Sequence, residues 1–296
     1  MDNNQPIFVR GMSRSGGTLL VTILDAHPKI AMSYELYPHL LEPERNGNFT
    51  FAEFEKALRK ARKISSLASR LPSSGLGRFI TRCTRSDILI DDLLRIVSEF
   101  KVQGLGFENY TDRCLFMELC CKVKMYKEKK SVWGIKCTGR YKEYMDVWPK
   151  AKFLNIIRDG RDILASQLNT GAFNKTPAQV AKGWVSTHSS FRSMAKKNEG
   201  SGLEVFYEKL VTQPELEIRK ICNFLDIEFD SSQLEFYKKE LTIHKVNHLS
   251  SDRIAKPIDD SKIGRWKKEL SKHQLHEFLE FAGESLDYYG YKSNEE

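Results

Sequence analysis

The residues with the clearest chemical potential stand near the start of the chain, around three glycines. They are Gly11, Gly16 and Gly17. An apolar segment ends at Val9 before them, and an apolar helical pattern begins at Thr18 after them. A strand, a glycine turn and a helix in that order place unpaired N–H groups at a helix N-terminus, where the helix dipole favours negative charge. The stretch therefore predicts a site for a phosphate or a sulfate.

The loop of nucleoside triphosphatases is the obvious comparison, and this stretch departs from it. That motif places Gly-Lys-Ser/Thr after Gly-x-x-x-x, with the lysine on the β/γ-phosphates. The spacing from Gly11 to Gly16 fits, but Gly17 occupies the lysine position and the nearby cation is Arg14. A kinase with a degenerate loop is one alternative, although no magnesium-binding acid clearly follows an apolar strand. A glycine-rich turn that binds nothing is another.

A second candidate anion site starts at Arg158, directly after the most continuous apolar segment, 152–157. Such a segment is typical of a buried parallel strand, and ligands of open α/β sheets bind at the carboxyl ends of the strands. A guanidinium there can make bidentate contacts with a phosphate. Ser166 follows eight residues later, two helical turns on, and could face the same phosphate. A salt-bridged turn is the alternative interpretation of Arg158 and its neighbours.

Both stretches resemble motifs of sulfotransferases, which use 3′-phosphoadenosine-5′-phosphosulfate (PAPS). Residues 14–20 with Asp25-Ala26-His27-Pro28 and Glu35 resemble the family's 5′-phosphosulfate loop. Residues 153–166 are similar to its 3′-phosphate motif, and the arginine-to-serine spacing is intact. Two matches in the expected order are more specific than either alone. The pattern is closest to bacterial and tyrosylprotein-type sulfotransferases.

The resemblance implies how the nucleotide would be held. The 5′-phosphosulfate would contact the loop residues Arg14, Ser15, Gly16, Gly17 and Thr18. The 3′-phosphate would contact Arg158 and Ser166, and Tyr207 stands where the family has a tyrosine near the adenine. A later segment resembles the C-terminal loop that closes over PAPS, with Ser261, Lys262, Gly264, Arg265 and Trp266 as its candidate contacts. Without the resemblance, that segment would be a helix N-terminus with a buried Trp266.

Sulfuryl transfer to a hydroxyl group needs a base for the proton and cations for the developing negative charge. Glu35 stands near the end of the expected second strand, 30–36, where related enzymes keep their base. Lys136 ends the expected third strand, 132–136, and would stabilise the leaving group together with Arg14. A glutamate at a strand end can also be an ordinary surface residue, which leaves a histidine as the alternative base.

No metal is expected. His244 and His248 have i,i+4 spacing, but no glutamate occupies the zinc-protease position between them. His27, between Ala26 and Pro28, is interpreted as a structural contact at a helix C-terminus.

The elements that must position these residues alternate strand and helix, which predicts an α/β fold with a P-loop-like parallel sheet flanked by helices. One domain, 1–296, is expected. Residues from about 42 to 130 form a helical insertion after the second strand and are the expected acceptor-binding part. They include an amphipathic basic helix, 54–71, that either packs on the domain or touches a membrane or an anionic acceptor. Residues from about 241 to 267 would cover the cofactor.

Composition narrows the class of protein without identifying it. Hydrophobic residues make up 41% and charged residues 29%, which is ordinary for a globular protein, and the net charge of +8 favours an anionic partner. There is no apolar signal region and no transmembrane segment, so a cytoplasmic location is expected. The expected partner is a hydroxyl-bearing acceptor (a sugar, a peptide, a lipid or a small molecule), with no nucleic acid. A module that binds adenosine 3′,5′-bisphosphate without turnover is the non-catalytic alternative.

Overall fold

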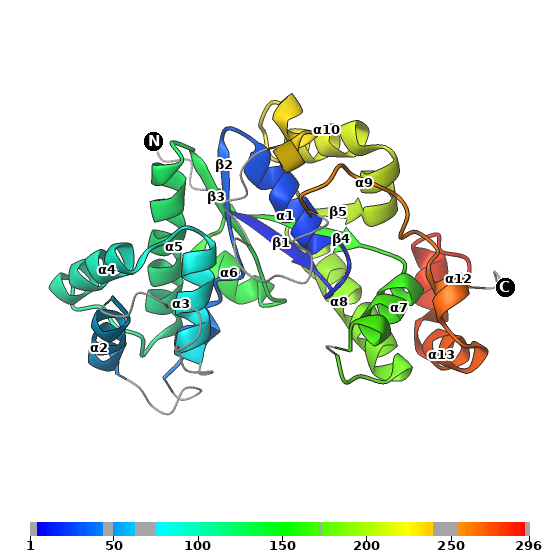
Figure 1. Ribbon diagram of the computed structural model, residues 1–296, viewed down its shortest axis with the longest axis horizontal. Coiled ribbons are helices and arrows are strands. Elements are labelled where there is room, and N and C mark those ends of the chain that lie inside the picture. The colour runs from blue at the N-terminus through cyan, green and yellow to red at the C-terminus, as the bar shows by residue number, and fades with distance from the viewer. Residues whose placement is uncertain (1–4, 44–49, 63–74, 172, 239–253, 294–296) are drawn as a thin grey trace.

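The computed structural model describes residues 5–43, 50–62, 75–171, 173–238 and 254–293. At its centre lies a five-stranded sheet in which every neighbouring pair is parallel, in the order β2-β3-β1-β4-β5 (Figure 1). The strands are β1 (Ile7–Gly11), β2 (Ile30–Ser33), β3 (Val132–Lys136), β4 (Lys152–Ile157) and β5 (Gly202–Phe206). The predicted α/β class with a parallel sheet is confirmed.

Helices connect the strands and cover both faces of the sheet (Figure 1). Those outside the insertion are α1 (Gly17–Ala26), α6 (Tyr141–Val147), α7 (Gly160–Thr170), α8 (Pro177–Lys197), α9 (Tyr207–Thr212), α10 (Pro214–Phe224), α12 (Trp266–Glu269) and α13 (Lys272–Tyr288). Short 3₁₀ helices are η1 (Pro38–Leu41), η4 (Ser231–Gln233) and η5 (Phe236–Lys238).

Alternate side chains of the central strands enter two different cores, as strand geometry requires. On one face, Val9 and Leu154 pack with buried residues of α1 and α10. On the other face, Phe8 stacks on Phe153 and on Tyr144 of α6, at ring-centroid distances of 5.2 and 4.7 Å. Both cores lie behind the carboxyl ends of β1, β3 and β4, and they hold these ends in fixed register for the site described below.

The insertion lies between β2 and β3, as expected, and consists of α2 (Phe51–Arg62), α3 (Gly75–Arg85), α4 (Ile90–Val102) and α5 (Tyr110–Lys127). These helices form a group at one side of the sheet (Figure 1). Phe116 is fully buried at their centre, where its ring meets those of Phe54, Phe100 and Phe107 at 5.0–5.5 Å between centroids. Helix α5 also packs on β2 and β3, so the insertion shares its core with the sheet.

Two local predictions were wrong. The second strand ends at Ser33 instead of Leu36, because the Tyr34 N–H donates to the Ser86 hydroxyl (2.7 Å) and Glu35 adopts a positive φ of 44°. Residues 72–77, which contain Pro72 and two glycines, were expected to form a loop, but helix α3 begins at Gly75. The burial of Phe79 in the insertion outweighs the low helix propensity of its glycines. Of the expected helix at 54–71, the part beyond Arg62 lies outside the described residues.

Candidate active site

The segment 12–16 connects β1 to α1 and forms a tight turn at the carboxyl edge of the sheet. The Ser15 N–H donates to the Met12 carbonyl at 3.1 Å. Arg14 and Gly16 both adopt positive φ, 77° and 96°. Gly16 caps α1 without a side-chain hydrogen bond. The N–H groups of the first turn of α1 are therefore available to an anion, with the helix dipole behind them.

Gly16 is required by the packing of this turn as well as by its backbone conformation. A Cβ at this position would stand 2.6 Å from a ring carbon of Tyr207, so an alanine would clash in addition to being strained. The Tyr207 ring packs against the turn at Gly16. The Arg158 guanidinium lies over the face of this ring, 4.4 Å from its centroid. Tyr207 and Arg158, both expected at the nucleotide site, thus pack against the turn and against each other.

Two buried polar atoms beside the turn have no hydrogen-bond partner among the described residues. They are the Ser15 hydroxyl and the Arg158 Nε, on side chains of residues that are 0% and 3% exposed. Buried polar groups in proteins are almost always paired, so unpaired donors point to a ligand or to ordered water. Both are donors suited to phosphate oxygens, which fits an anionic nucleotide in this place.

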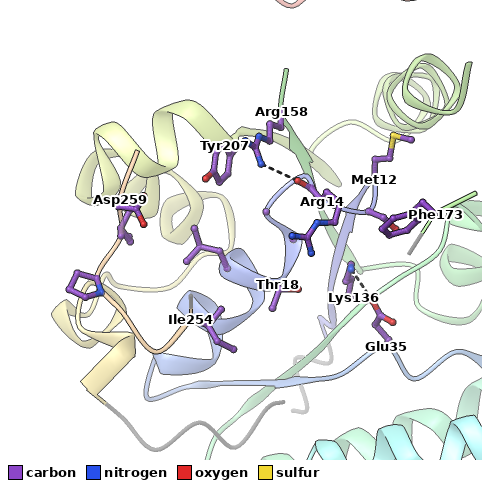
Figure 2. Close-up of a pocket in the computed structure, with 16 residues that line it drawn as sticks. Met12, Arg14, Thr18, Glu35, Lys136, Arg158, Phe173, Tyr207, Ile254 and Asp259 are labelled. Atoms are coloured by element: carbon purple, nitrogen blue, oxygen red, sulfur yellow. Dashed lines mark hydrogen bonds and ion pairs between the residues drawn. The ribbon is translucent and has the colours of Figure 1, made fainter. Parts of the chain in front are cut away.

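The turn opens into a cleft of about 1000 Å³, including the solvent-open space at its mouth (Figure 2). Of the sequence-predicted site residues, those that line it are Arg14, Gly16, Gly17, Thr18, Glu35, Lys136, Arg158 and Tyr207. They lie at or just after the ends of β1, β2, β3 and β4 and at the start of α1 and α9. Residues separated by up to 193 positions in the sequence (Arg14 to Tyr207) therefore meet at one edge of the sheet.

Glu35 and Lys136 form an ion pair in the cleft, with 2.8 Å between Lys136 Nζ and Glu35 Oε1 (Figure 2). Their side chains are only 17% and 18% exposed, so the pair is largely shielded from solvent. Lys136 also reaches the turn, since its Cε lies 3.3 Å from the position that a Cβ at Gly17 would occupy. One cation thus faces both the carboxylate and the anion site, and the glycine at position 17 gives it room.

Arg14, Arg158 and Ser166 lie together at the edge of the cleft. The Arg14 Nε donates to the Ser166 hydroxyl at 3.1 Å. Arg158 Nη1 donates to the Arg14 carbonyl at 3.2 Å (Figure 2). Ser166 itself is buried on α7 and does not line the cleft. The two arginines and the serine form one connected group, so a change at any of them is expected to disturb the others.

The C-terminal segment, 261–266, contacts the group formed by Arg14, Arg158 and Ser166, and the sequence did not indicate these contacts. Arg158 Nη2 donates to the Lys262 carbonyl at 2.5 Å, so the backbone of Lys262 makes the contact. Buried Asp162 accepts the N–H groups of Gly264 and Trp266 at 3.0 and 3.1 Å. Burial raises the pKa of the Asp162 carboxyl, while Arg158 and these donors oppose the shift. Asp162 therefore anchors the segment beside Arg158.

Three of the proposed contacts in this segment are placed away from the cleft. Trp266 is 4% exposed and lies under the Arg161 guanidinium at 4.0 Å, so its ring is part of the core and offers no open face to a base. Arg265 pairs with Glu269 at 2.8 Å, and the exposed Ser261 donates to Asp259. The structure supports the buried-tryptophan alternative here, because the cation over the indole comes from the protein itself.

The cleft also contains residues that were not named as site residues: Met12, Ser13, Leu19, Phe173, Ile254, Pro257, Ile258 and Asp259. The last four belong to the segment 241–267 that was expected to cover the cofactor. Most are apolar, and no residue type or spacing distinguishes them in the sequence from ordinary core positions. Part of the expected cofactor-covering stretch, 239–253, lies outside the described residues, as do His244 and His248. His27 is a structural residue, as interpreted: its ring contacts the Glu228 carbonyl at 2.9 Å and accepts the Lys29 N–H.

Comparison with known proteins identifies relatives for most of the chain. Residues 6–231 match the model of the sulfotransferase family. The chain is 26% identical over 274 residues to protein-tyrosine sulfotransferase A of Caenorhabditis elegans, covering 88% of this chain and 60% of that protein. It is 26% identical over 292 residues to the protein-tyrosine sulfotransferase of Drosophila melanogaster, covering 93% of this chain and 50% of that protein. The chain thus spans 50–60% of the length of these two relatives.

Solved structures of the same fold include two bacterial-type sulfotransferase domains and a mammalian enzyme. The sulfotransferase domain of the curacin biosynthetic pathway gives a TM-score of 0.62 at 16% identity, covering 99% of both chains. The domain of the Synechococcus PCC 7002 olefin synthase gives 0.60 at 19% identity, covering 95% and 96%. A mouse sulfotransferase complexed with PAP gives 0.50 at 16% identity, covering 95% of this chain and 84% of the other. At these identities the likeness concerns the fold.

The expected cytoplasmic location is wrong. The relatives are protein-tyrosine sulfotransferases, which are Golgi-resident membrane enzymes. The expectation relied on the absence of an apolar leader or span from this sequence. Because the chain covers only part of the length of these relatives, that absence carries no information about the location of the protein. Within the described ranges, no helix is long and apolar enough to cross a membrane.

Proposed function

The chain belongs to the sulfotransferase family, and on that premise we propose that it transfers the sulfuryl group of PAPS to a hydroxyl group of an acceptor. The observation that carries the proposal is the meeting of Glu35 and Lys136 beside the glycine turn of the cleft. A carboxylate, a cation and a helix N-terminus together supply the base and the anion stabilisation that the reaction needs. A simple nucleotide-binding module has no need of the carboxylate.

The turn and the group around Arg158 would hold the nucleotide. The first-turn N–H groups of α1 and the Ser15 hydroxyl would contact the 5′-phosphosulfate, with Thr18 on the same turn. Arg158 and Ser166 would contact the 3′-phosphate, and Tyr207 would lie near the adenine. When bound, PAPS supplies the sulfuryl group and leaves adenosine 3′,5′-bisphosphate (PAP) behind.

Glu35 and Lys136 would divide the catalytic work between them. Glu35 would accept the proton of the acceptor hydroxyl as that oxygen becomes the nucleophile. Lys136, which contacts both the carboxylate and the edge of the turn, would stabilise negative charge on the leaving oxygen together with Arg14. Because the two cations are fixed before the reaction, little reorganisation is needed when the charge develops.

The insertion would form the acceptor side of the cleft. Glu35 lies between β2 and the insertion, and Phe173 lines the cleft with its aromatic ring near the Glu35–Lys136 pair (Figure 2). A phenol would pack well beside such a ring. The names of the two relatives favour a tyrosine side chain of a peptide as the acceptor.

The stabilisation of the folded protein by different nucleotides distinguishes a sulfotransferase from a kinase with a degenerate phosphate loop. A ligand that binds only the folded state stabilises it by RT ln(1 + [L]/Kd), about 2.7 kcal/mol at a hundredfold excess over Kd. We expect adenosine 3′,5′-bisphosphate to raise the melting temperature much more than ATP with magnesium does. A thermal shift assay measures both, and a larger shift with ATP and magnesium would favour the kinase instead.

Arg158→Ala is expected to weaken the binding of the bisphosphate about ten- to a hundredfold, because a charge-assisted contact contributes about 1.5–3 kcal/mol. Isothermal titration calorimetry measures the loss. Arg140→Ala, which removes a partly exposed arginine whose Glu143 partner is 3.7 Å away, is the control and should bind normally. Wild-type affinity in Arg158→Ala would show that the 3′-phosphate is held elsewhere.

A further inference from the structure

Helix α3 of the insertion and the residue that follows it contact the segment that carries Glu35. The Ser86 hydroxyl, directly after α3, accepts the Tyr34 N–H at 2.7 Å. Arg82, in the last turn of α3, lies over the Tyr37 ring at 4.8 Å from the centroid. Contacts thus reach the residue before Glu35 and the residue two places after it, from the last turn of α3 and from the residue that follows it.

Arg82 also contacts Glu35 itself, at two different groups. Its Nη1 donates to the Glu35 backbone carbonyl at 3.0 Å, and its Nη2 lies 3.4 Å from the Glu35 Oε2. Lys136 occupies the other carboxylate oxygen, Oε1, at 2.8 Å. Each oxygen therefore has its own cation, one from the sheet and one from the insertion, and this fixes the plane of the carboxylate.

The backbone of Glu35 needs such support. Its φ of 44° is a left-handed conformation that a residue with a side chain adopts only when its surroundings require it. The guanidinium is planar and has several N–H donors in a fixed fork, so one side chain can hold the carbonyl and the carboxylate together. A lysine carries the same charge, but it cannot reproduce this geometry.

We propose that Arg82 is the positioning residue for Glu35, so that α3 of the insertion sets where the carboxylate stands in the cleft. The proposal rests on the proposed function, in which Glu35 is the base. It deepens that function by making an element of the acceptor side responsible for the geometry of the base. Arg82 acts through Glu35 and does not line the cleft.

The test compares Arg82→Gln with Arg82→Lys and with a control on the same helix. Arg78, one helical turn earlier, is exposed, so Arg78→Gln removes the same charge without touching Glu35. A base displaced by about 1 Å costs about a hundredfold in rate. We therefore expect turnover in Arg82→Gln to fall about 10–100-fold, with PAP affinity and acceptor KM near those of the wild type. Arg82→Lys should recover part of the loss, and Arg78→Gln should match the wild type.

Amide hydrogen exchange of residues 30–41 in the PAP-bound protein supplies a readout that needs no activity. Arg82→Gln should raise exchange in this peptide, whereas Arg78→Gln should leave it unchanged. Unchanged exchange, or a loss of PAP affinity as large as the loss of rate, would overturn the positioning role. If the wild type transfers no sulfuryl group, the proposed function fails, while the exchange comparison still decides whether Arg82 holds the segment.

Discussion

Glu35→Gln should turn over an alcohol acceptor about 10²–10⁴-fold more slowly than the wild type at saturating PAPS, because the substitution removes the proton acceptor and keeps the shape. The carboxylate stands in the cleft, where its oxygens pair with Lys136 at 2.8 Å and with Arg82 at 3.4 Å, and the proposed nucleotide contacts are made by other residues. Affinity for adenosine 3′,5′-bisphosphate should therefore stay near the wild-type value. Initial rates and calorimetry on the same preparation measure the two quantities.

An acidic acceptor is the internal control for this variant. A nitrophenol loses its proton readily, so its reaction depends less on a base, and the Glu35→Gln defect should shrink with it. Near-normal turnover of a true alcohol by Glu35→Gln would remove Glu35 from the mechanism. The search for the base would then turn to His39, which stacks on Tyr37, or to His244 outside the described residues.

Lys136→Met should lower turnover about 10²–10³-fold, the cost of removing one fixed donor from a developing negative charge. Methionine keeps the length of the side chain beside Gly17, so the turn should keep its shape. Lys142→Met is the matched control because Lys142 is exposed on α6, away from the cleft. Single-turnover rates in the presence of excess enzyme measure the chemical step.

The double variant Glu35→Gln/Lys136→Met tests whether the two residues act as a unit. Since they form one ion pair, the second substitution should cost much less than it does alone. A wild-type rate in Lys136→Met would exclude Lys136 from charge stabilisation. Fully additive losses would show that the pair in the cleft has no catalytic coupling.

The sequence was sufficient for the parts of the fold that depend on local pattern. Continuous apolar segments predicted β4, and the strand–glycine–helix order predicted the turn before α1. The end of β2 was not predictable, because it depends on the Ser86 hydroxyl, which follows α3 and lies 52 positions away in the sequence. The start of helix α3 was missed since its glycines disfavour a helix locally, whereas the burial of Phe79, Ile80 and Cys83 stabilises it.

The residues of the candidate site also fall into those that local sequence pattern could predict and those that depend on tertiary packing. Arg158 was predicted at the carboxyl edge of the sheet because it follows a buried parallel strand. Glu35 and Lys136 were expected beside the turn from their places near strand ends and from the resemblance to sulfotransferases. The expected contact of Trp266 with the base is not supported, because Arg161 of α7, which is far away in the sequence, covers its ring. Phe173 was missed because an apolar residue in a connecting segment carries no signal that separates a cleft lining from a core. Arg82 was missed because its role depends on the tertiary packing of α3 on Glu35.

The measurement that tests the central proposal most directly is the transfer of radiolabel from [³⁵S]PAPS to an acceptor panel. The panel should contain a tyrosine peptide, a sugar, a lipid alcohol and a small phenol, with Glu35→Gln as the negative control. The proposed function predicts a labelled acceptor and one equivalent of adenosine 3′,5′-bisphosphate, both lost in the variant. A protein that binds the bisphosphate yet leaves PAPS intact with every acceptor class would contradict it.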